Sequence, residues 1–483
     1  MLYMSQKSIK FNFLYNILLQ VSKVIFPLIT APYVARVLEP EGVGLFNFAN
    51  TYANYFALFA ALGVPLYGIR EIAKVRDDIE SQTKFVSEII SLLLVTTILC
   101  VAIYLGTLLL IPQLNENFLI FILSALCLYV TPFRIDWYFQ GKEEFGYITM
   151  RSLVIKVVSI ACLFIFVHEK SDLINYIIIN AASTTINELW NYTKLYKTGV
   201  HPYLTLNFKK HFKPLLVLFS SSVAISIYTI LDTLMLGFMT DYNQVGYYNS
   251  ATNISKSILP IATSLAAVVM PRMSYYTKTE NWEEINRLLK KSLDVVSFLC
   301  FPLMMGVIVI APTFVPLFFG DKFVNAILPL QVVIGVVTAI GFNNLLGIQV
   351  LIGLGKDKLF LNAVLIGTFS NFFLNLLLIP YIGAVGAAIA SVTAETLILF
   401  YEVYLVRKHT QIRFSGYRNI LMCLVVSLFF IPIEMLTGHI VSGWGEVILF
   451  FVFGTSFYIL ATFMLKNPAV MLFVEAIKKK INR

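Results

Sequence analysis

The chain has 483 residues, of which 58% are hydrophobic and only 13% are charged, and its mean hydropathy is +0.80. A soluble domain of this size would carry about twice that charged fraction, so the composition excludes an ordinary soluble protein. The long unbroken apolar runs also exclude a membrane β-barrel, because barrel strands alternate apolar and polar residues. The sequence therefore predicts an all-α membrane protein.

The apolar runs predict about fourteen transmembrane helices. They cover residues 9–37, 42–69, 85–111, 117–139, 148–167, 173–193, 214–239, 247–271, 292–311, 323–353, 359–379, 384–406, 419–436 and 445–465. The segments on one side of these spans hold 29 of the 36 Lys and Arg residues, whereas the opposite loops hold only Lys170 and Lys322. Because basic residues concentrate in cytoplasmic loops, we expect both termini in the cytoplasm. This distribution accounts for the net charge of +9 without a nucleic-acid partner.

Signals of processing and of catalysis are missing from the sequence. The first apolar segment is too long for a cleavable signal peptide and lacks an A-x-A-like site. The five cysteines fall within predicted spans and form no C-x-x-C pair, which indicates apolar packing rather than disulfides or a metal site. The five histidines are scattered, and no H-E-x-x-H, G-x-S-x-G or P-loop pattern occurs. We therefore expect a protein that is not an enzyme and has no cofactor.

Two deep lysines share a local pattern. Lys23 and Lys256 each stand near the middle of an apolar run, four residues before Pro27 and Pro260. A proline removes the N–H that would bond the carbonyl four residues earlier, so each lysine should lie at a kink. A charge at that depth costs about 2.5–3.5 kcal/mol on insertion scales and is usually retained for function. The two lysines therefore indicate a cationic cavity that binds an anion.

Three more basic residues lie inside predicted spans, and each has an alternative role. Arg36 could bind the same anion near the outer end of the first span, or anchor the helix at the interface. Lys156 lies nearer the inner side, where cavity lining and snorkelling are equally open. Arg134 is a further cavity candidate, but Arg134 and Asp136 are two residues apart and cannot face each other on a helix. Ion pairs with other helices are the expected role of both.

Acidic residues within the spans are candidates for coupling. Asp232 lies well inside the seventh span, where it could bind a coupling proton or Na⁺ or pair with a cavity lysine. Glu188 and Glu402 lie nearer the inner ends of their spans, so we expect them to be solvated or paired.

Two segments outside the spans have apolar residues at helical spacing. Residues 281–289 should form a short interfacial helix, with a Glu283–Arg287 pair on one face. Residues 470–481 should form a basic amphipathic tail on the inner leaflet.

The chain contains a weak internal repeat. Residues 43–49 (VGLFNFA) recur as residues 245–251 (VGYYNSA), 202 positions later, and both copies join an outward-going span to the returning one. Two six-helix units of the same orientation would follow, with the working site between them. The expected divisions are an N-lobe at 1–196, a C-lobe at 197–406, and two extra helices with the basic tail at 407–483.

The chain resembles one family in several motifs. Residues 26–38 (FPLITAPYVARVL), followed by residues 40–44 (PEGVG), resemble the first-helix signature of Wzx-type polysaccharide flippases. Residues 68–71 (GIRE) and 136–141 (DWYFQG) are similar to further motifs of that family. The resemblance implies the MATE-like fold of the multidrug/oligosaccharidyl-lipid/polysaccharide superfamily, with two pseudo-symmetric six-helix lobes around a cavity. In related lipid II flippases, basic residues on the first and eighth helices line that cavity, in places similar to Lys23 and Lys256.

The resemblance also implies a function. The family moves undecaprenyl-diphosphate-linked oligosaccharides from the inner to the outer leaflet of the bacterial plasma (inner) membrane by alternating access, for capsule or O-antigen-type polysaccharide. The expected partners are this lipid-linked glycan and the bilayer, while H⁺ or Na⁺ coupling and contact with a downstream polymerase stay open. The alternatives are a teichoic-acid repeat flippase, a cation-coupled multidrug exporter of the same superfamily, and a membrane glycan polymerase. The mainly basic deep charges disfavour a cationic drug, and the short outer loops disfavour a polymerase.

Overall fold

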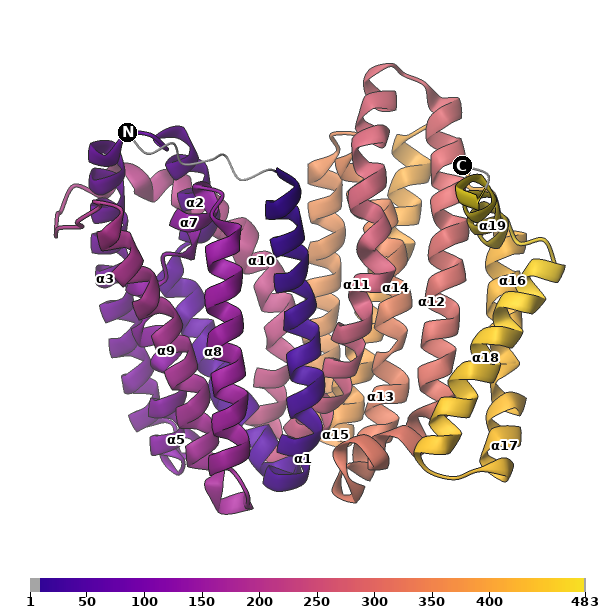
Figure 1. Ribbon diagram of the computed structural model, residues 1–483, viewed down its shortest axis with the longest axis horizontal. Helices are drawn as coiled ribbons and strands as arrows, with labels where there is room; N and C mark the ends of the chain where they lie inside the picture. Colours follow the sequence, from indigo (N-terminus) through magenta and orange to yellow (C-terminus); the bar gives the residue numbers. More distant parts are fainter. Residues whose placement is uncertain (1–8, 482–483) are drawn as a thin grey trace. The chain divides into compact units, whose positions relative to one another are not determined.

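The computed structural model describes residues 9–481, except for the side chains at 9, 10, 12, 13, 16, 23, 217, 218, 220–229, 264–268, 473 and 476–481. Throughout residues 9–481 the chain forms helices, turns and bends and no strand (Figure 1), which confirms the predicted all-α class. The chain divides into two compact units, at residues 1–246 (unit 1) and 247–483 (unit 2).

Unit 1 contains the first ten α-helices of the chain. They are α1 (Ile9–Ala61), α2 (Val64–Lys74), α3 (Ile79–Leu110), α4 (Pro112–Asn115), α5 (Phe118–Ser124), α6 (Leu126–Tyr129), α7 (Asp136–Gly141), α8 (Phe145–Phe166), α9 (Leu173–Lys197) and α10 (Lys209–Met239), with short 3₁₀ turns η1 (Thr131–Phe133) and η2 (Lys170–Asp172). The helices α1, α8 and α9 pack side by side, and α3 packs against α1 (Figure 1).

The helix α1 is bent where two membrane spans were predicted to meet. Its 53 residues would extend about 80 Å if straight, more than twice the roughly 30 Å of a bilayer core. The bend lies at Glu39, whose φ of 60° and ψ of 174° are non-helical. Glu39 precedes Pro40, and the proline ring disfavours helical backbone at the residue before it. By contrast, α1 continues through Pro27 with helical backbone.

Two of the family motifs pack against each other in unit 1. The segments 68–71 and 136–141 lie on α2 and α7, which sit together at one end of the unit (Figure 1). Tyr67 and Ile72 of α2 join Trp137 and Tyr138 of α7 in one buried apolar cluster with α3. The adjacent α3 begins at Asp78, whose carboxylate accepts hydrogen bonds from the backbone N–H groups of Glu80 and Ser81 and so caps the helix. These motifs therefore have a structural role.

The two copies of the repeated motif also meet, at the bend of α1. A Cβ placed on Gly44 would lie 1.7 Å from the carbonyl oxygen of Tyr242, and one on Gly246 would lie 2.1 Å from that of Pro40. Only glycine allows two backbones to approach this closely. The glycines of the repeat are therefore explained by packing of the α1 bend against the turn after α10.

Unit 2 begins within α11 and contains the remaining helices. They are α11 (Tyr242–Lys278), α12 (Trp282–Phe319), α13 (Ile327–Val333), α14 (Gly335–Asn343), α15 (Asp357–His409), α16 (Tyr417–Leu428), α17 (Phe430–Ile440), α18 (Trp444–Met464) and α19 (Pro468–Ile481), with a 3₁₀ segment η3 (Asp321–Ala326) and a π-helical segment η4 (Asn344–Ile352). Like α1, α15 is interrupted midway, at Ile382 and Gly383, and so separates two predicted spans. The backbone of α11 stays helical through Pro260.

One predicted helix is placed differently. Residues 281–289 form no separate interfacial helix, because Asn281 caps α12 and the helix runs on without a break to Phe319. The amide oxygen of Asn281 accepts the backbone N–H of Glu284, and the apolar spacing of the segment continues directly into the next span. The predicted C-terminal helix is confirmed as α19.

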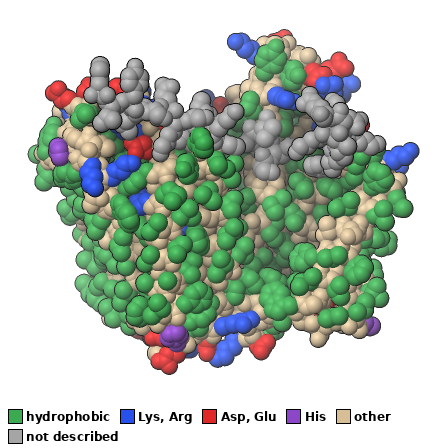
Figure 2. All heavy atoms as spheres, in the orientation of Figure 1, with side chains coloured by type: hydrophobic (Ala, Val, Ile, Leu, Met, Phe, Trp, Pro, Cys, Tyr) green, Lys and Arg blue, Asp and Glu red, His purple; other side chains and the backbone are tan. Residues whose placement is uncertain are grey.

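Eight helical segments of the described chain are long and apolar enough to cross a membrane. They are Ile17–Lys74, Ile79–Leu110, Phe145–Phe166, Trp282–Phe319, Asp321–Ile352, Asp357–His409, Tyr417–Ile440 and Trp444–Met464. On the face shown in Figure 2, hydrophobic side chains cover the middle, and charged side chains gather above and below them. The chain is thus a multi-pass membrane protein.

Candidate functional site

Lys156 places a positive charge at mid-helix. It is the twelfth of the 22 residues of α8 and is half-buried. Its ammonium nitrogen lies 5.2 Å from the ring centroid of Phe26 on α1, within the range of a cation–π interaction. The charge is therefore held at the contact between α1 and α8.

Arg36 lies three residues before the bend of α1 at Glu39, and its side chain is exposed. Charges of both signs gather at this end of unit 1. The ammonium of Lys170 lies 2.7 Å from the carboxylate of Glu41 and 3.9 Å from that of Glu39. The Glu41 carboxylate raises the pKa of Lys170 through this hydrogen bond and through its charge. The surroundings of Arg36 are thus mixed in charge rather than purely basic.

Arg134 and Asp136 each pair with another helix, as their spacing indicated. The guanidinium Nε of Arg134 lies 3.9 Å from a carboxylate oxygen of Glu188 on α9. Asp136 accepts a 2.7 Å hydrogen bond from Arg151 of α8 and a 2.8 Å bond from the amide of Asn191. These contacts join the start of α7 to α8 and α9.

Arg151 was missed as a site residue. In the sequence it counts among the basic residues of an inner loop, yet its side chain is only 1% exposed. Besides Asp136, its Nε donates to the side-chain oxygen of Asn187 at 3.0 Å. Charged hydrogen-bonded groups with this degree of burial fix the helices that carry them, so the network is mainly structural.

A second buried network lies around Glu88 of α3. Its carboxylate contacts the ammonium of Lys210 at 2.9 Å and Nε2 of His211 at 2.8 Å. The other ring nitrogen of His211 is 2.7 Å from the hydroxyl oxygen of Tyr67. When Nε2–H donates to Glu88, Nδ1 accepts the Tyr67 hydroxyl, so both ring nitrogens are used. This network ties α2, α3 and α10 together, and the scattered positions of its members hid it in the sequence.

The remaining predicted site residues lie in both units. Asp232 is a buried residue of α10 in unit 1, and Lys256 is an exposed residue of α11 in unit 2. Lys23 belongs to α1, but its side chain lies outside the described part of the structure. The predicted cavity residues therefore come from at least three elements of unit 1 and one of unit 2.

Glu402 of α15 differs from its sequence expectation. It was expected to be solvated or paired, but it is 0% exposed, and neither carboxylate oxygen has a hydrogen-bond partner among the described residues. The expectation is wrong because the last turns of α15 are packed inside an apolar cluster, although the basic residues 407–408 follow closely.

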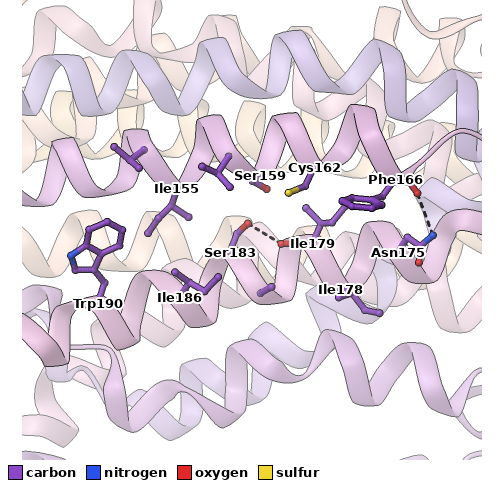
Figure 3. Close-up of a pocket in the computed structure, with 13 residues that line it drawn as sticks. Ile155, Ser159, Cys162, Phe166, Asn175, Ile178, Ile179, Ser183, Ile186 and Trp190 are labelled. Atoms are coloured by element: carbon purple, nitrogen blue, oxygen red, sulfur yellow. Dashed lines mark hydrogen bonds between the residues drawn. The ribbon is translucent and has the colours of Figure 1, made fainter.

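An apolar groove of about 400 Å³ runs between α8 and α9 (Figure 3). Its walls are mainly aliphatic, with Phe166 and Trp190 towards its two ends (Figure 3). Two of its polar side chains bond to nearby backbone: Ser183 donates to the carbonyl of Ile179 and Asn175 to that of Phe166. The groove therefore suits a hydrocarbon chain rather than a polar ligand. Across the described residues, no group of three or more His, Cys, Asp and Glu side chains could hold a metal ion.

Comparisons with known proteins agree on one family. The sequence profile of the family described as polysaccharide biosynthesis protein matches residues 9–277. An Escherichia coli K12 protein named "Putative O-antigen transporter" is 26% identical over 405 residues, which cover 83% of this chain and 97% of that protein.

Two solved structures share the fold. The lipid II flippase MurJ, in an inward closed conformation, has a TM-score of 0.76 at 17% identity and covers 94% of this chain and 98% of its own. An inward-facing multidrug resistance MATE family transporter of the MOP superfamily has a TM-score of 0.62 at 14% identity, over 82% of this chain and 98% of its own. The fold is thus MurJ- and MATE-like. Because the family profile covers more than half of the sequence, the chain belongs to the polysaccharide biosynthesis protein family, as its resemblance to Wzx-type flippases indicated.

Proposed function

We propose that the protein is a flippase that moves undecaprenyl-diphosphate-linked oligosaccharide repeat units from the inner to the outer leaflet of the bacterial plasma membrane. The translocated units would be used for a capsule or O-antigen-type polysaccharide. The observation that carries the proposal is the near full-length similarity to the Escherichia coli relative, whose name gives O-antigen as its cargo. The shared fold with a lipid II flippase supports the same class of cargo.

The proposed topology has fourteen membrane helices, with both termini in the cytoplasm. Two six-helix lobes, at 1–196 and 197–406, would be followed by two extra helices and the basic tail. The breaks at Glu39 and at residues 382–383 support this count, because each divides a helix that is too long for one crossing.

The diphosphate would be bound by basic side chains of the membrane helices. A lysine ammonium is a compact point charge for phosphate oxygens, and an arginine guanidinium can bind them through two bonds. Lys156 supports this role best, because its charge lies at mid-helix. Lys23, Lys256, Arg36 and Arg134 are the further members of the proposed cavity, with Asp232 as a proposed coupling residue.

Transport would follow alternating access. The head group enters from the inner side, binds the basic residues and leaves outward, while the prenyl tail stays in lipid. An inside-negative potential assists outward movement of each negative charge by about 2.3 kcal/mol per 100 mV.

Substitution of the deep lysines tests the proposal. Lys156→Met keeps an apolar stem on α8 but removes the charge that would contact the diphosphate. Loss of one charge-assisted contact of about 1.5–3 kcal/mol predicts roughly 10- to 100-fold weaker binding and a corresponding loss of glycan export. Lys23→Ala and Lys256→Ala should behave similarly. Lys358→Ala, which changes an exposed lysine at the start of α15, is the control and should export normally.

Protein amount and membrane insertion are measured in parallel for each variant. Full export by all three variants at normal protein level would contradict the proposed cationic cavity.

A further inference from the structure

Glu402 is enclosed by the apolar core of unit 2. Its side chain lies against the backbone of Gly347 in η4, since a Cβ added to Gly347 would stand 2.4 Å from the carboxylate oxygen Oε1. The ring of Phe360 packs on the same glycine, 2.7 Å from that Cβ position. The adjacent turns contribute Ile398 and Leu405 to the buried cluster. The carboxyl group therefore has hydrocarbon and aromatic neighbours.

The Glu402 carboxyl must be neutral in this conformation. Both oxygens are buried, and neither receives a hydrogen bond from the described residues. An ionised carboxylate without a cation or hydrogen-bond donor is strongly penalised in such surroundings, and such a group takes up a proton instead. Protonation removes the charge and leaves a group of the same shape.

The helix that covers Glu402 is unusual. Residues Asn344–Ile352 form a π-helical segment, a conformation that is rare and frequently marks functional sites. Gly347 lies within this segment and provides the space that the carboxyl occupies. A change of η4 to regular helical geometry would shift Gly347 relative to Glu402 and so alter the cover of the carboxyl.

A second buried acid lies on the same face of α15. Glu395 precedes Glu402 by seven residues, which is two helical turns or about 10 Å along the axis. Its carboxylate accepts a hydrogen bond from the amide of Asn343, which also donates to the Glu395 carbonyl at 3.0 Å. Asn343 is the residue directly before η4. Both acids are therefore in contact with the α14–η4 region.

Other titratable groups around Glu402 do not supply a positive charge. The sequences of α14 and η4 contain no titratable side chain. Those in or against the same apolar cluster are phenols and thiols rather than basic groups: Tyr276, Cys300, Tyr401 and Cys423. Apart from Glu395, the other carboxylic and basic groups on α15 and on the turn before it lie near the helix ends: Lys356, Asp357, Lys358, Arg407, Lys408 and His409.

We propose that Glu402 is a proton-binding site, with Glu395 as its buried acidic neighbour and η4 as the element that controls its access to water. A proton could leave towards the end of α15, because Glu402 is five residues, or roughly 8 Å, from Arg407. The coupling of proton exchange at Glu402 to glycan movement rests on the proposed function. A metal cation is the weaker occupant, because hard cations require several further oxygen ligands.

Infrared difference spectroscopy on the purified full chain in liposomes tests proton binding independently of transport. A protonated carboxyl has a carbonyl band that an ionised one lacks. Near neutral pH, Glu402→Gln should remove one such band, whereas the control Glu283→Gln, at an exposed position of α12, should leave the spectrum unchanged. Gly347→Ala should shift the band, because the added methyl group meets the carboxyl. A wild-type spectrum that matches that of Glu402→Gln in this region would overturn the proposal.

Export measured in cells tests the coupling. Because Gln cannot release a proton, Glu402→Gln should lower glycan export by about tenfold or more, equivalent to roughly 1.4 kcal/mol, at unchanged protein level. Glu402→Asp should retain most export. If the Glu402→Gln variant exports glycan at the wild-type level, the coupling is overturned, even where the carbonyl band has been assigned to Glu402. If depletion of the wild-type protein leaves export unchanged, the proposed function fails while the spectroscopic result stands.

Discussion

Glu402 of unit 2 differs from three acids of unit 1 in its surroundings. In unit 1, the buried Glu88 and Glu188 and the partly exposed Asp136, here called the paired acids, each contact a basic side chain between 2.7 and 3.9 Å away. In unit 2, Glu402 is fully buried but has neither a cation nor a hydrogen-bond donor among the described residues.

This difference distinguishes charged groups that stabilise the packing of helices from a group that can gain or lose a proton. A buried ion pair with additional hydrogen bonds holds helices in register, and removal of one partner leaves the other charge buried and unpaired. An unpaired buried carboxyl is stable only as the neutral acid, so its charge changes when water reaches it. Burial alone therefore does not mark a group that can exchange a proton, and the absence of a partner is the second feature on which the proposal for Glu402 rests.

The largest effect is expected at the Arg151–Asp136 pair. Arg151→Ala leaves the Asp136 carboxylate without its cation. Breaking a buried pair costs about 3–5 kcal/mol, and because Asp136 keeps 36% exposure we expect about 2–3 kcal/mol. Thermal unfolding in detergent should show a clearly lowered Tm. Arg76→Ala removes an exposed pair with Glu143 and should cost at most about 1 kcal/mol, so equal losses would contradict a special role for the buried pair.

A smaller loss is expected at the Glu88 network. Glu88→Gln keeps the shape of the side chain but removes the charge that contacts Lys210 and His211. Hydrogen bonds to charged groups contribute about 1.5–3 kcal/mol, so unfolding should occur at a measurably lower denaturant concentration. The exposed Glu80→Gln on the same helix is the control. A variant as stable as that control would show that the network does not hold α10 to α3.

Glu402→Gln should have little effect on stability. The amide resembles the neutral acid in size, so we expect a change within about 1 kcal/mol of the wild type. The same calorimetric or fluorescence unfolding measurement applies. A loss as large as that of Arg151→Ala would mean that Glu402 is ionised and paired, and the contrast between the units would disappear.

The smallest effect is expected at Asp172, a half-buried acid in the turn before α9. Asp172 accepts backbone hydrogen bonds from His168 and Glu169, which lower its pKa. Because the folded pKa is below the unfolded one, this contribution is present above the ordinary pKa of Asp and is lost as pH falls through the folded pKa. Asp172→Asn should therefore flatten the acid side of the stability profile slightly. An unchanged acid limb would show that the turn does not depend on this charge.

Much of the fold could be predicted because membrane helices are encoded by simple apolar runs. The break at Glu39 falls between two predicted spans, since a proline and a cluster of polar residues coincide there. The continuity of α12 could not be predicted, because a polar segment with helical spacing looks the same as a separate interfacial helix or as the extension of a span.

The candidate site was less predictable, since it depends on contacts between distant segments. In the sequence, Arg151 counts among the basic loop residues that set the membrane topology. Only the packing of α7, α8 and α9 shows that it pairs with Asp136. The sequence does contain a pattern that predicts the burial of Glu402. Ala387, Ser391, Ala394, Ile398 and Leu405 are buried at helical spacing, and Glu395 and Glu402 fall on that same face.

The most direct test of the account is the leaflet in which lipid-linked repeat units accumulate when the protein is depleted. Membrane vesicles of defined orientation, probed with a glycan-binding reagent that cannot cross the bilayer, distinguish the two leaflets. A flippase predicts accumulation on the cytoplasmic leaflet, reversed by the wild-type chain but not by Lys156→Met. Accumulation on the outer leaflet would contradict the account and indicate a step after translocation.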